Sequence, residues 1–194
     1  MGVLNVTPDS FSDGGRYVES AALRTRVRQL LAEGADIIDV GGESTRPGAA
    51  GVDAGDELAR VLPAIRAIRA ESDVPISIDT SKPQVMCEAV AAGANMINDV
   101  RALRATGALE AAAELGVAVC LMHMQGEPRS MQVAPHYGDV VGEVKAFLAE
   151  RAASCEAAGI PRSRLVLDPG FGFGKSLQHN LLLFRQLPGL LELG

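Results

Sequence analysis

The chain has 194 residues, a length that fits one domain with a substantial core. Hydrophobic residues make up 47% and charged residues 22%, an ordinary globular composition that excludes intrinsic disorder. A net charge of -6 argues against a nucleic-acid-binding protein, which would carry a basic face. No apolar run approaches the length of a membrane span, and the N-terminus lacks the features of a signal peptide. We therefore expect a cytoplasmic protein that binds neither nucleic acid nor membrane.

Cysteine and histidine give no sign of a disulfide framework or a metal site. The three cysteines are far apart, odd in number and without a C-x-x-C pair. The three histidines match no metal-ligand spacing. We expect reduced, structural cysteines and no histidine-bound metal.

Six short apolar runs rich in β-branched residues predict six strands, each buried on both faces. The runs are residues 3–6, 37–40, 76–78, 96–100, 117–122 and 165–167. Helical spacing fills the intervals, most clearly in the stripe Leu58, Val61, Leu62, Ile65 and Ile68. A second stripe lies between residues 23 and 31, and Gly34 follows it as a C-cap. Such alternation predicts an α/β protein with a parallel sheet and crossover helices, without a linker or second domain.

Periodicity alone leaves two parallel architectures open, a doubly wound sheet and a (β/α)8 barrel. No G-x-G-x-x-G turn follows the first strand, as a dinucleotide-binding fold would require. Instead, polar clusters follow the strands at 5–10, 43–47, 79–82, 98–99, 123–125 and 168–170. One group from each strand end is how a barrel builds its site, so the barrel is favoured.

Several of these polar residues also have purely structural explanations. Ser81 stands where it could cap a helix that begins at Lys82-Pro83. Asn98-Asp99 could form an Asx-turn. His123 could be a hydrogen-bonded strand-end residue. Neither a cap nor a turn explains Asp79, which falls at the strand end itself.

Glycines punctuate three of the polar loops. Residues 168–176 contain Gly-Lys-Ser, but Pro169 stands where a phosphate loop requires glycine, so we reject that interpretation. These glycines would instead let the backbone approach a flat ligand, with Lys175 near the rim. The loops 5–15 and 41–51 are polar and could close over a reacting centre. The residues by themselves predict a barrel enzyme for a small polar ligand.

The segment at residues 2–15, GVLNVTPDSFSDGG, resembles the first-strand signature of the dihydropteroate synthase family. Further segments agree in the same order, at 39–48, 78–83, 97–99, 121–126 and 167–175. The resemblance extends from end to end. It implies a (β/α)8 TIM barrel, here incomplete with about six βα units, as a single pterin-binding domain over residues 1–194.

The resemblance implies a transferase of folate biosynthesis, the target of sulfonamides. This family condenses 6-hydroxymethyl-7,8-dihydropterin diphosphate with 4-aminobenzoate to give 7,8-dihydropteroate and diphosphate, and usually forms homodimers. Two alternatives are a non-catalytic pterin-binding module and the pterin domain of a methyltetrahydrofolate methyltransferase. The intact loops around Asn5 and Thr45 disfavour both.

By resemblance, Asn5 is a magnesium ligand, and its amide oxygen suits a hard cation. Asp79, Asn98 and Asp168 correspond to pterin-binding positions. A pterin presents an amine beside a ring N–H, so Asp168 could accept both hydrogen bonds. Asp79 would lie nearer the reactive methylene and stabilise a cationic pterin.

The second loop carries Thr45, Arg46 and Pro47, which by resemblance shape the aminobenzoate pocket. We expect Thr45 and Arg46 to be catalytic, and Arg46 could face either the diphosphate or the aminobenzoate carboxylate. The remaining matches are pocket-wall or substrate-binding positions: Met122, His123, Phe173 and Lys175.

The chain departs from the family in length, because a (β/α)8 barrel typically needs about 250 residues. Strands seven and eight have no counterpart here, nor do the family's pterin-binding lysine and its diphosphate-binding arginine and histidine. We interpret the chain as an incomplete copy of a longer enzyme that can be inactive as it stands. Its two open sheet edges should pair with other chains or aggregate.

Overall fold

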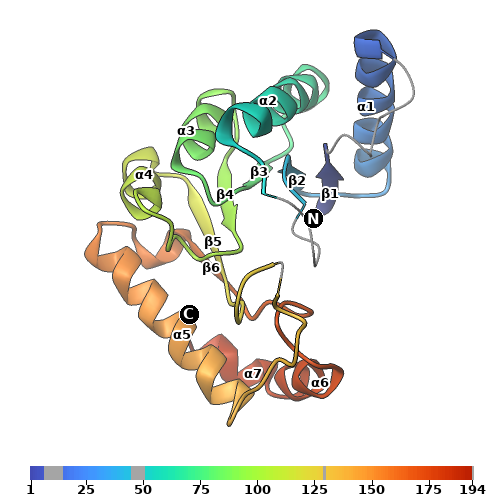
Figure 1. Cartoon of the computed structure of the whole chain (residues 1–194). Coiled ribbons are helices and arrows are strands. Elements are labelled where there is room, and N and C mark those ends of the chain that lie inside the picture. The colour runs from blue at the N-terminus through green and yellow to red at the C-terminus, as the bar shows by residue number, and fades with distance from the viewer. Residues whose placement is uncertain (7–14, 45–50, 129, 194) are drawn as a thin grey trace.

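The computed structural model describes residues 1–6, 15–44, 51–128 and 130–193, in which strands and helices alternate (Figure 1). The strands are β1 (Gly2–Asn5), β2 (Ile38–Gly41), β3 (Ile76–Asp79), β4 (Met96–Asp99), β5 (Ala118–Met122) and β6 (Leu165–Asp168). The α-helices are α1 (Gly15–Ala32), α2 (Ala54–Glu71), α3 (Pro83–Ala91), α4 (Ala108–Leu115), α5 (Val140–Ala157), α6 (Leu177–Arg185) and α7 (Leu187–Leu190). Two 3₁₀ turns, η2 (Arg162–Arg164) and η3 (Leu191–Leu193), complete the described elements.

The order of the strands distinguishes between the two architectures. All six strands are parallel and stand in the order β1-β2-β3-β4-β5-β6. A doubly wound sheet reverses direction at a switch point, whereas this order never reverses. With right-handed crossovers, such an order places every helix on the same face, and Figure 1 shows α2 to α5 along the outside of the curved sheet. The fold is therefore an incomplete barrel, as predicted.

All six predicted strands are present, with ends shifted by at most one residue. The expectation that each is buried on both faces is wrong for β1 and β6. Val3 is 55% exposed and Val166 is 48% exposed, and both point to the inner face of the sheet. Among the described residues, β1 pairs only with β2 and β6 only with β5, so nothing covers these side chains.

The apolar core lies between the outer face of the sheet and the helices. Val61, Ile65 and Ile68 of α2 are fully buried against it, as the helical stripe predicted. Gly34 ends the first helix at φ +86°, and its N–H donates to Leu31 O at 3.0 Å, which confirms the predicted cap. No helix in the described ranges is long and apolar enough to cross a membrane.

The inner face of the sheet is polar. Strand side chains alternate between the faces, and the register aligns Asp39 with Ser77 and, one step nearer the C-terminal ends, Asp79 with Asn98. Asp168 ends β6 on the same side, opposite Met122. The carboxyl ends of the strands therefore gather acids and amides around the barrel mouth.

Candidate functional site

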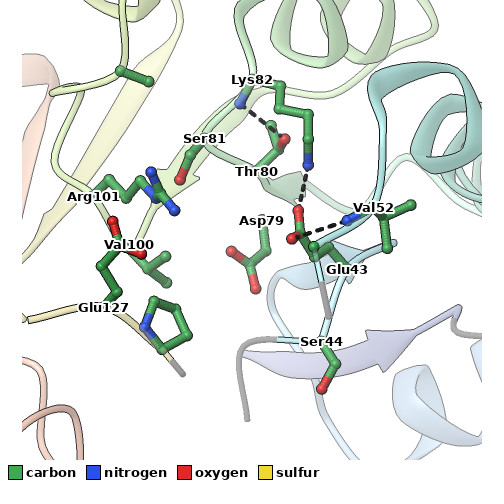
Figure 2. A pocket seen from close by; sticks show the side chains of 13 residues that line it. Glu43, Ser44, Val52, Asp79, Thr80, Ser81, Lys82, Val100, Arg101 and Glu127 are labelled. Carbon is green, nitrogen blue, oxygen red and sulfur yellow. Dashed lines mark hydrogen bonds and ion pairs between the residues drawn. The ribbon is translucent and has the colours of Figure 1, made fainter. Parts of the chain in front are cut away.

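Asp79 ends β3, and its carboxyl group points into a pocket of ≈ 340 Å³ (Figure 2). Loops after β2, β3, β4 and β5 line this pocket, with Glu43, Lys82, Arg101 and Glu127 as their charged members. No hydrogen bond or ion pair reaches the Asp79 carboxylate from the described residues. Burial raises the pKa of Asp79 well above its usual range, and the nearby negative charges raise it further. A cationic ligand would therefore be strongly favoured beside Asp79.

Asp39 lies one step below Asp79 on the inner face, and only 6% of its surface is exposed. The amide nitrogen of Asn98 donates to both of its carboxylate oxygens, at 3.4 and 3.3 Å. Burial raises the pKa of Asp39, while the neighbouring polar side chains of Ser77 and Asn98 oppose the rise. Asp39 and Asn98 thus form a polar pair across the strand between them.

Gly41 leaves space for two polar side chains from neighbouring strands. A Cβ atom added here would lie 3.3 Å from Asn5 Oδ1 and 3.5 Å from Asp79 Oδ2. The absence of a side chain therefore lets the amide and the carboxylate approach the same point. Asn5 offers one hard oxygen ligand, but the described residues contain no group of three His, Cys, Asp or Glu side chains able to hold a metal ion.

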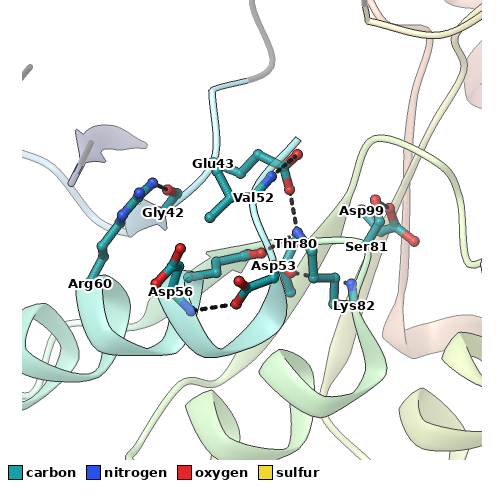
Figure 3. Close-up of polar contacts among 11 residues, drawn as sticks. Gly42, Glu43, Val52, Asp53, Asp56, Arg60, Thr80, Ser81, Lys82 and Asp99 are labelled. Carbon is teal, nitrogen blue, oxygen red and sulfur yellow. Dashed lines mark hydrogen bonds and ion pairs between the residues drawn. The ribbon is translucent and has the colours of Figure 1, made fainter. Parts of the chain in front are cut away.

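Lys82 joins the loop after β2 to helix α2. Its ammonium group donates to Glu43 (Figures 2 and 3). It also donates to Glu57, whose side chain is fully buried. Burial lowers the pKa of Lys82, but the bonds to these carboxylates outweigh that effect and raise it. Glu43 also accepts from the N–H of Val52 at 3.3 Å. The network therefore ties the chain on both sides of the 45–50 segment to the end of β3.

Lys175 fixes the glycine-rich loop that follows β6. Only 3% of its surface is exposed, and Nζ donates to the carbonyl oxygens of His123, Gly170 and Phe173 at 3.1, 2.9 and 2.9 Å. Burial lowers the pKa of Lys175 to about 8. The N–H of Gly170 donates to Asp168 Oδ1 at 2.7 Å, which orients that carboxylate within the same loop.

The ring of His123 supplies a fourth polar contact to Lys175, because Lys175 Nζ lies 3.0 Å from His123 Nδ1. Its ring stands edge-on to Phe147, with 4.9 Å between centroids. Burial and then the Lys175 charge lower the pKa of His123 to about 4, so the imidazole is neutral at pH 7. This confirms the interpretation of His123 as a hydrogen-bonded strand-end residue.

The sequence profile described as pterin binding enzyme matches residues 1–194. The chain belongs to the pterin binding enzyme family. Dihydropteroate synthase of Escherichia coli strain K12 is 56% identical over 187 residues, which is 96% of this chain and 66% of that protein. Dihydropteroate synthase of Haemophilus influenzae is 50% identical over 194 residues, which is 100% of this chain and 70% of that protein. The chain thus spans about two thirds of the length of these curated relatives.

Solved structures of pterin binding enzymes share the fold. Xanthomonas albilineans dihydropteroate synthase with 4-aminobenzoic acid matches with a TM-score of 0.91 and 55% identity, over 100% of this chain and 68% of that one. The same enzyme in complex with 7,8-dihydropteroate matches with a TM-score of 0.86 and 51% identity, at the same coverage. Yersinia pestis dihydropteroate synthase in a sulfonamide drug complex matches with a TM-score of 0.91 and 49% identity, over 99% of this chain and 69% of that one. These matches confirm the family resemblance and the barrel architecture.

The described residues bring most sequence-predicted site positions to the inner face at the strand ends. Asp79, Met122 and Asp168 end β3, β5 and β6, and Asn98 is the last residue but one of β4. Phe173 packs on the apolar group of Val100, Met122, Met124 and Met131 beside them. The second-loop residues expected at the aminobenzoate pocket lie outside the described residues: Thr45, Arg46 and Pro47.

Two local expectations need correction, and one is confirmed. Lys175 lies beneath its loop instead of near the rim, because burying its ammonium group requires the carbonyl acceptors found there. Ser81 does not cap α3, whose N-cap is Lys82 without a side-chain bond, and its hydroxyl donates to Asp99 instead. Asp99 does form the Asx-turn, accepting from the N–H of Arg101 at 2.8 Å.

Sequence reasoning missed two buried acids, Asp39 and Glu57. Asp39 interrupts an apolar strand, and a carboxylate in a run expected to be buried was the available signal. Glu57 precedes Val61 by four residues and Ile65 by eight, which places it on the buried stripe of α2. Both were recognisable as charged residues at core positions.

Proposed function

We propose that this protein is a dihydropteroate synthase, which condenses 6-hydroxymethyl-7,8-dihydropterin diphosphate with 4-aminobenzoate. The observation that carries the proposal is the set of Asp79, Asn98 and Asp168 around one barrel mouth, in a chain about half identical to enzymes of that name. The Xanthomonas albilineans enzyme binds 4-aminobenzoic acid in one related structure and 7,8-dihydropteroate in another, and these are a substrate and the product of this reaction.

Asp168 suits the pterin edge that carries an amine beside a ring N–H. The bond from Gly170 N–H to Oδ1 orients the carboxylate, and its remaining acceptor positions can receive both ligand hydrogens. Charged hydrogen bonds of this kind are worth about 1.5 to 3 kcal/mol each. Met122 and Phe173 supply apolar walls for the flat ring.

The Asp79 carboxylate could stabilise positive charge that forms at the reacting carbon of the pterin. The aminobenzoate nitrogen attacks the pterin methylene, the carbon–oxygen bond to diphosphate breaks, diphosphate takes the electron pair, and the amine loses a proton. If diphosphate leaves first, a cationic pterin forms, and ionised Asp79 would stabilise it in the transition state. The lack of a cationic partner for this carboxylate among the described residues leaves its charge available for that task.

The described residues would supply only part of the coordination shell of a magnesium ion. Asn5 supplies one amide oxygen beside Asp79, so water and diphosphate oxygens would complete the shell that magnesium prefers. The chemistry supplied by bound magnesium would be neutralisation of the leaving diphosphate. Homodimer formation by the full-length protein and a cytoplasmic location complete the proposal.

The deciding experiment is diphosphate release by the purified chain, supplied with magnesium and the pterin diphosphate, with and without 4-aminobenzoate. Release that depends on 4-aminobenzoate would support the transferase. Pterin binding without release would favour the non-catalytic module. Binding of a reduced folate with indifference to 4-aminobenzoate would favour the methyltransferase domain.

Asp79→Asn tests the role of the carboxylate. We expect kcat to fall by at least about tenfold with little change in KM, because the lost charge acts mainly in the transition state. Steady-state diphosphate release measures both constants. An unchanged kcat would remove Asp79 from the mechanism.

A further inference from the structure

The loop after β4 contains a strained turn. Ala102 and Leu103 have positive φ angles of 53° and 56°, in the left-handed region that residues with a side chain rarely adopt. Both residues are buried, so the turn packs against the core of the protein. Two consecutive residues in this region cost free energy, which other contacts of the fold must offset.

Contacts from two elements hold this turn. The two carboxylate oxygens of Asp99 accept separately from the N–H groups of Arg101 and Leu103, both at 2.8 Å. From α5, Arg151 Nε donates to Ala102 O at 2.9 Å, and its Nη2 donates to Leu103 O at 3.3 Å. The acid therefore fixes N–H groups of the turn, and the arginine fixes its carbonyl groups. Such complete restraint of an unfavourable conformation indicates that the conformation serves a function.

The turn brings two arginine side chains to one cavity. Arg101 precedes the left-handed residues, Arg104 follows them, and both line a cavity of ≈ 370 Å³ between the loops after β4 and β5. Arg101 and Glu127 also line the pocket that Asp79 enters, and Figure 2 shows the two side chains on the same side of that pocket. The cavity therefore adjoins the candidate reaction site.

Both guanidinium groups can receive a ligand. Among the described residues, no hydrogen bond or ion pair engages the guanidinium group of Arg101. Arg104 Nε donates to Arg101 O at 3.1 Å, and Arg104 Cζ lies 5.3 Å from the centre of the Phe147 ring. These contacts orient Arg104 before a ligand arrives. The two positive groups share the cavity with one acid, Glu127, in a chain whose net charge is -6.

We infer that this cavity is an oxyanion-binding site, in which Arg101 and Arg104 receive a phosphate or carboxylate group. A guanidinium group pairs with either anion through two parallel N–H bonds, and the two positive charges exceed the single charge of Glu127. Asp99 and Arg151 are the positioning residues of this site, because they hold the turn between the two arginines. Two sources supply the same chemistry: a free phosphate ion, and the carboxylate of a ligand seated in the adjoining pocket. Only the second source rests on the proposed function.

The test observes the cavity directly by NMR of the 194-residue chain. The reporters are the Nε–H of Arg104 and the backbone N–H of Gly126, which also lines the cavity. Inorganic phosphate is titrated against sodium chloride at equal ionic strength, so that general screening is the same in both series. We expect shifts that saturate with phosphate and no saturating shifts with chloride. Equal responses to the two salts would overturn the inference.

Arg101→Gln removes one guanidinium group and keeps Arg104 as a reporter. We expect the apparent affinity for phosphate to fall at least about tenfold, as loss of a charged hydrogen bond predicts. Arg66→Gln is the matched control, because Arg66 is an exposed arginine on α2 that does not line the cavity. This variant should keep the affinity of the unaltered chain. Equal phosphate affinity in Arg101→Gln and Arg66→Gln would overturn the inference.

Titration with 4-aminobenzoate distinguishes the two sources of the anion. Saturating shifts with phosphate alone would identify a free ion as the occupant. Saturating shifts with 4-aminobenzoate that are lost in Arg101→Gln would identify the carboxylate of a ligand in the adjoining pocket. No saturating response to either anion would overturn the inference. A response to phosphate in a chain that releases no diphosphate would support the oxyanion site and count against the proposed function.

Discussion

Burial of the ionised Asp79 carboxylate lowers the stability of the folded chain, and the sign of this effect can be measured. Burial and then neighbouring acids raise its pKa in the folded chain, so between the ordinary pKa and the raised value the folded state binds more protons than the unfolded state. Stability therefore falls as the pH rises through this window. We predict that Asp79→Asn raises the thermal unfolding midpoint at pH 7, and that the gain vanishes at acidic pH where Asp79 is protonated anyway.

Asp99 provides the matched control for this prediction. Its carboxylate accepts from the N–H groups of Arg101 and Leu103 on different oxygens, both at 2.8 Å, and asparagine can replace only one of those acceptors. Asp99→Asn should therefore lower the unfolding midpoint at pH 7. An Asp79→Asn variant that is also less stable at pH 7 would contradict our account of the electrostatics.

His123 has the opposite linkage to pH. Burial and then the charge of Lys175 lower its pKa from 6.5 to about 4, so the unfolded chain binds more protons in that window and stability is lost as the pH falls. The full effect corresponds to about 3 kcal/mol. We predict that His123→Asn, which keeps an acceptor for Lys175, loses less stability between pH 6.5 and 4 than the unaltered chain. Urea unfolding across this range measures it, and equal pH slopes would contradict the prediction.

At the scale of elements, the loop after β6 depends on close backbone contact with the chain after β5. Gly170 has φ +68°, and an added Cβ would overlap the carbonyl oxygen of His123. Gly172 has φ +83°, but nothing lies within 4 Å of its added Cβ. Gly172→Ala should therefore cost only the left-handed backbone penalty of about 1 to 2 kcal/mol.

Gly170→Ala should cost clearly more than Gly172→Ala, because β5 and the loop must separate. We also expect it to weaken pterin binding, since the same loop carries Asp168 and Phe173. Chemical unfolding and pterin titration of the two variants measure both effects. Equal losses of stability would show that backbone conformation, and not the contact, determines the cost.

The strands were predictable because apolar, β-branched runs are local signals, and the stripe of α2 was predictable because its spacing is local too. The polar strand ends were also predictable, since parallel strands bring their carboxyl ends to one edge. The directions and contacts of long polar side chains could not be predicted in this way. The inward direction of Lys175 depends in part on the carbonyl oxygen of His123, 52 residues away in the sequence.

The partner of Ser81 was equally beyond local reasoning. A serine before Lys82-Pro83 satisfies the rule for a helix cap, yet Asp99 on the adjacent strand offers a charged acceptor instead. Contacts across strands decide such cases, and a single sequence states only the residue types. The alternation of side chains between the two faces of a strand could be read from the sequence, however, and it predicts that Asp39 lies on the inner face of the sheet.

At the scale of the whole molecule, we expect protection of the backbone amides from hydrogen exchange to differ among the strands of the sheet. In the described part of the chain, β2 to β5 have neighbours on both sides, whereas β1 and β6 have one each. Strands with one neighbour leave half of their N–H groups without a sheet partner. We predict faster amide hydrogen exchange in peptides covering β1 and β6 than in those covering β3 and β4. Mass spectrometry resolves these peptides, and protection of β1 equal to that of β3 would contradict the prediction.

The strand order also dictates how the molecule can be built during synthesis. Each strand after β1 pairs with the strand made immediately before it, so the partner of each new strand has already left the ribosome. The site is assembled in the same order. Asp39 gains its hydrogen-bond partner Asn98 only after β4 is synthesised, and Asp168 is added only with β6. The sequence of translation is thus also the sequence in which the mouth of the barrel acquires its polar groups.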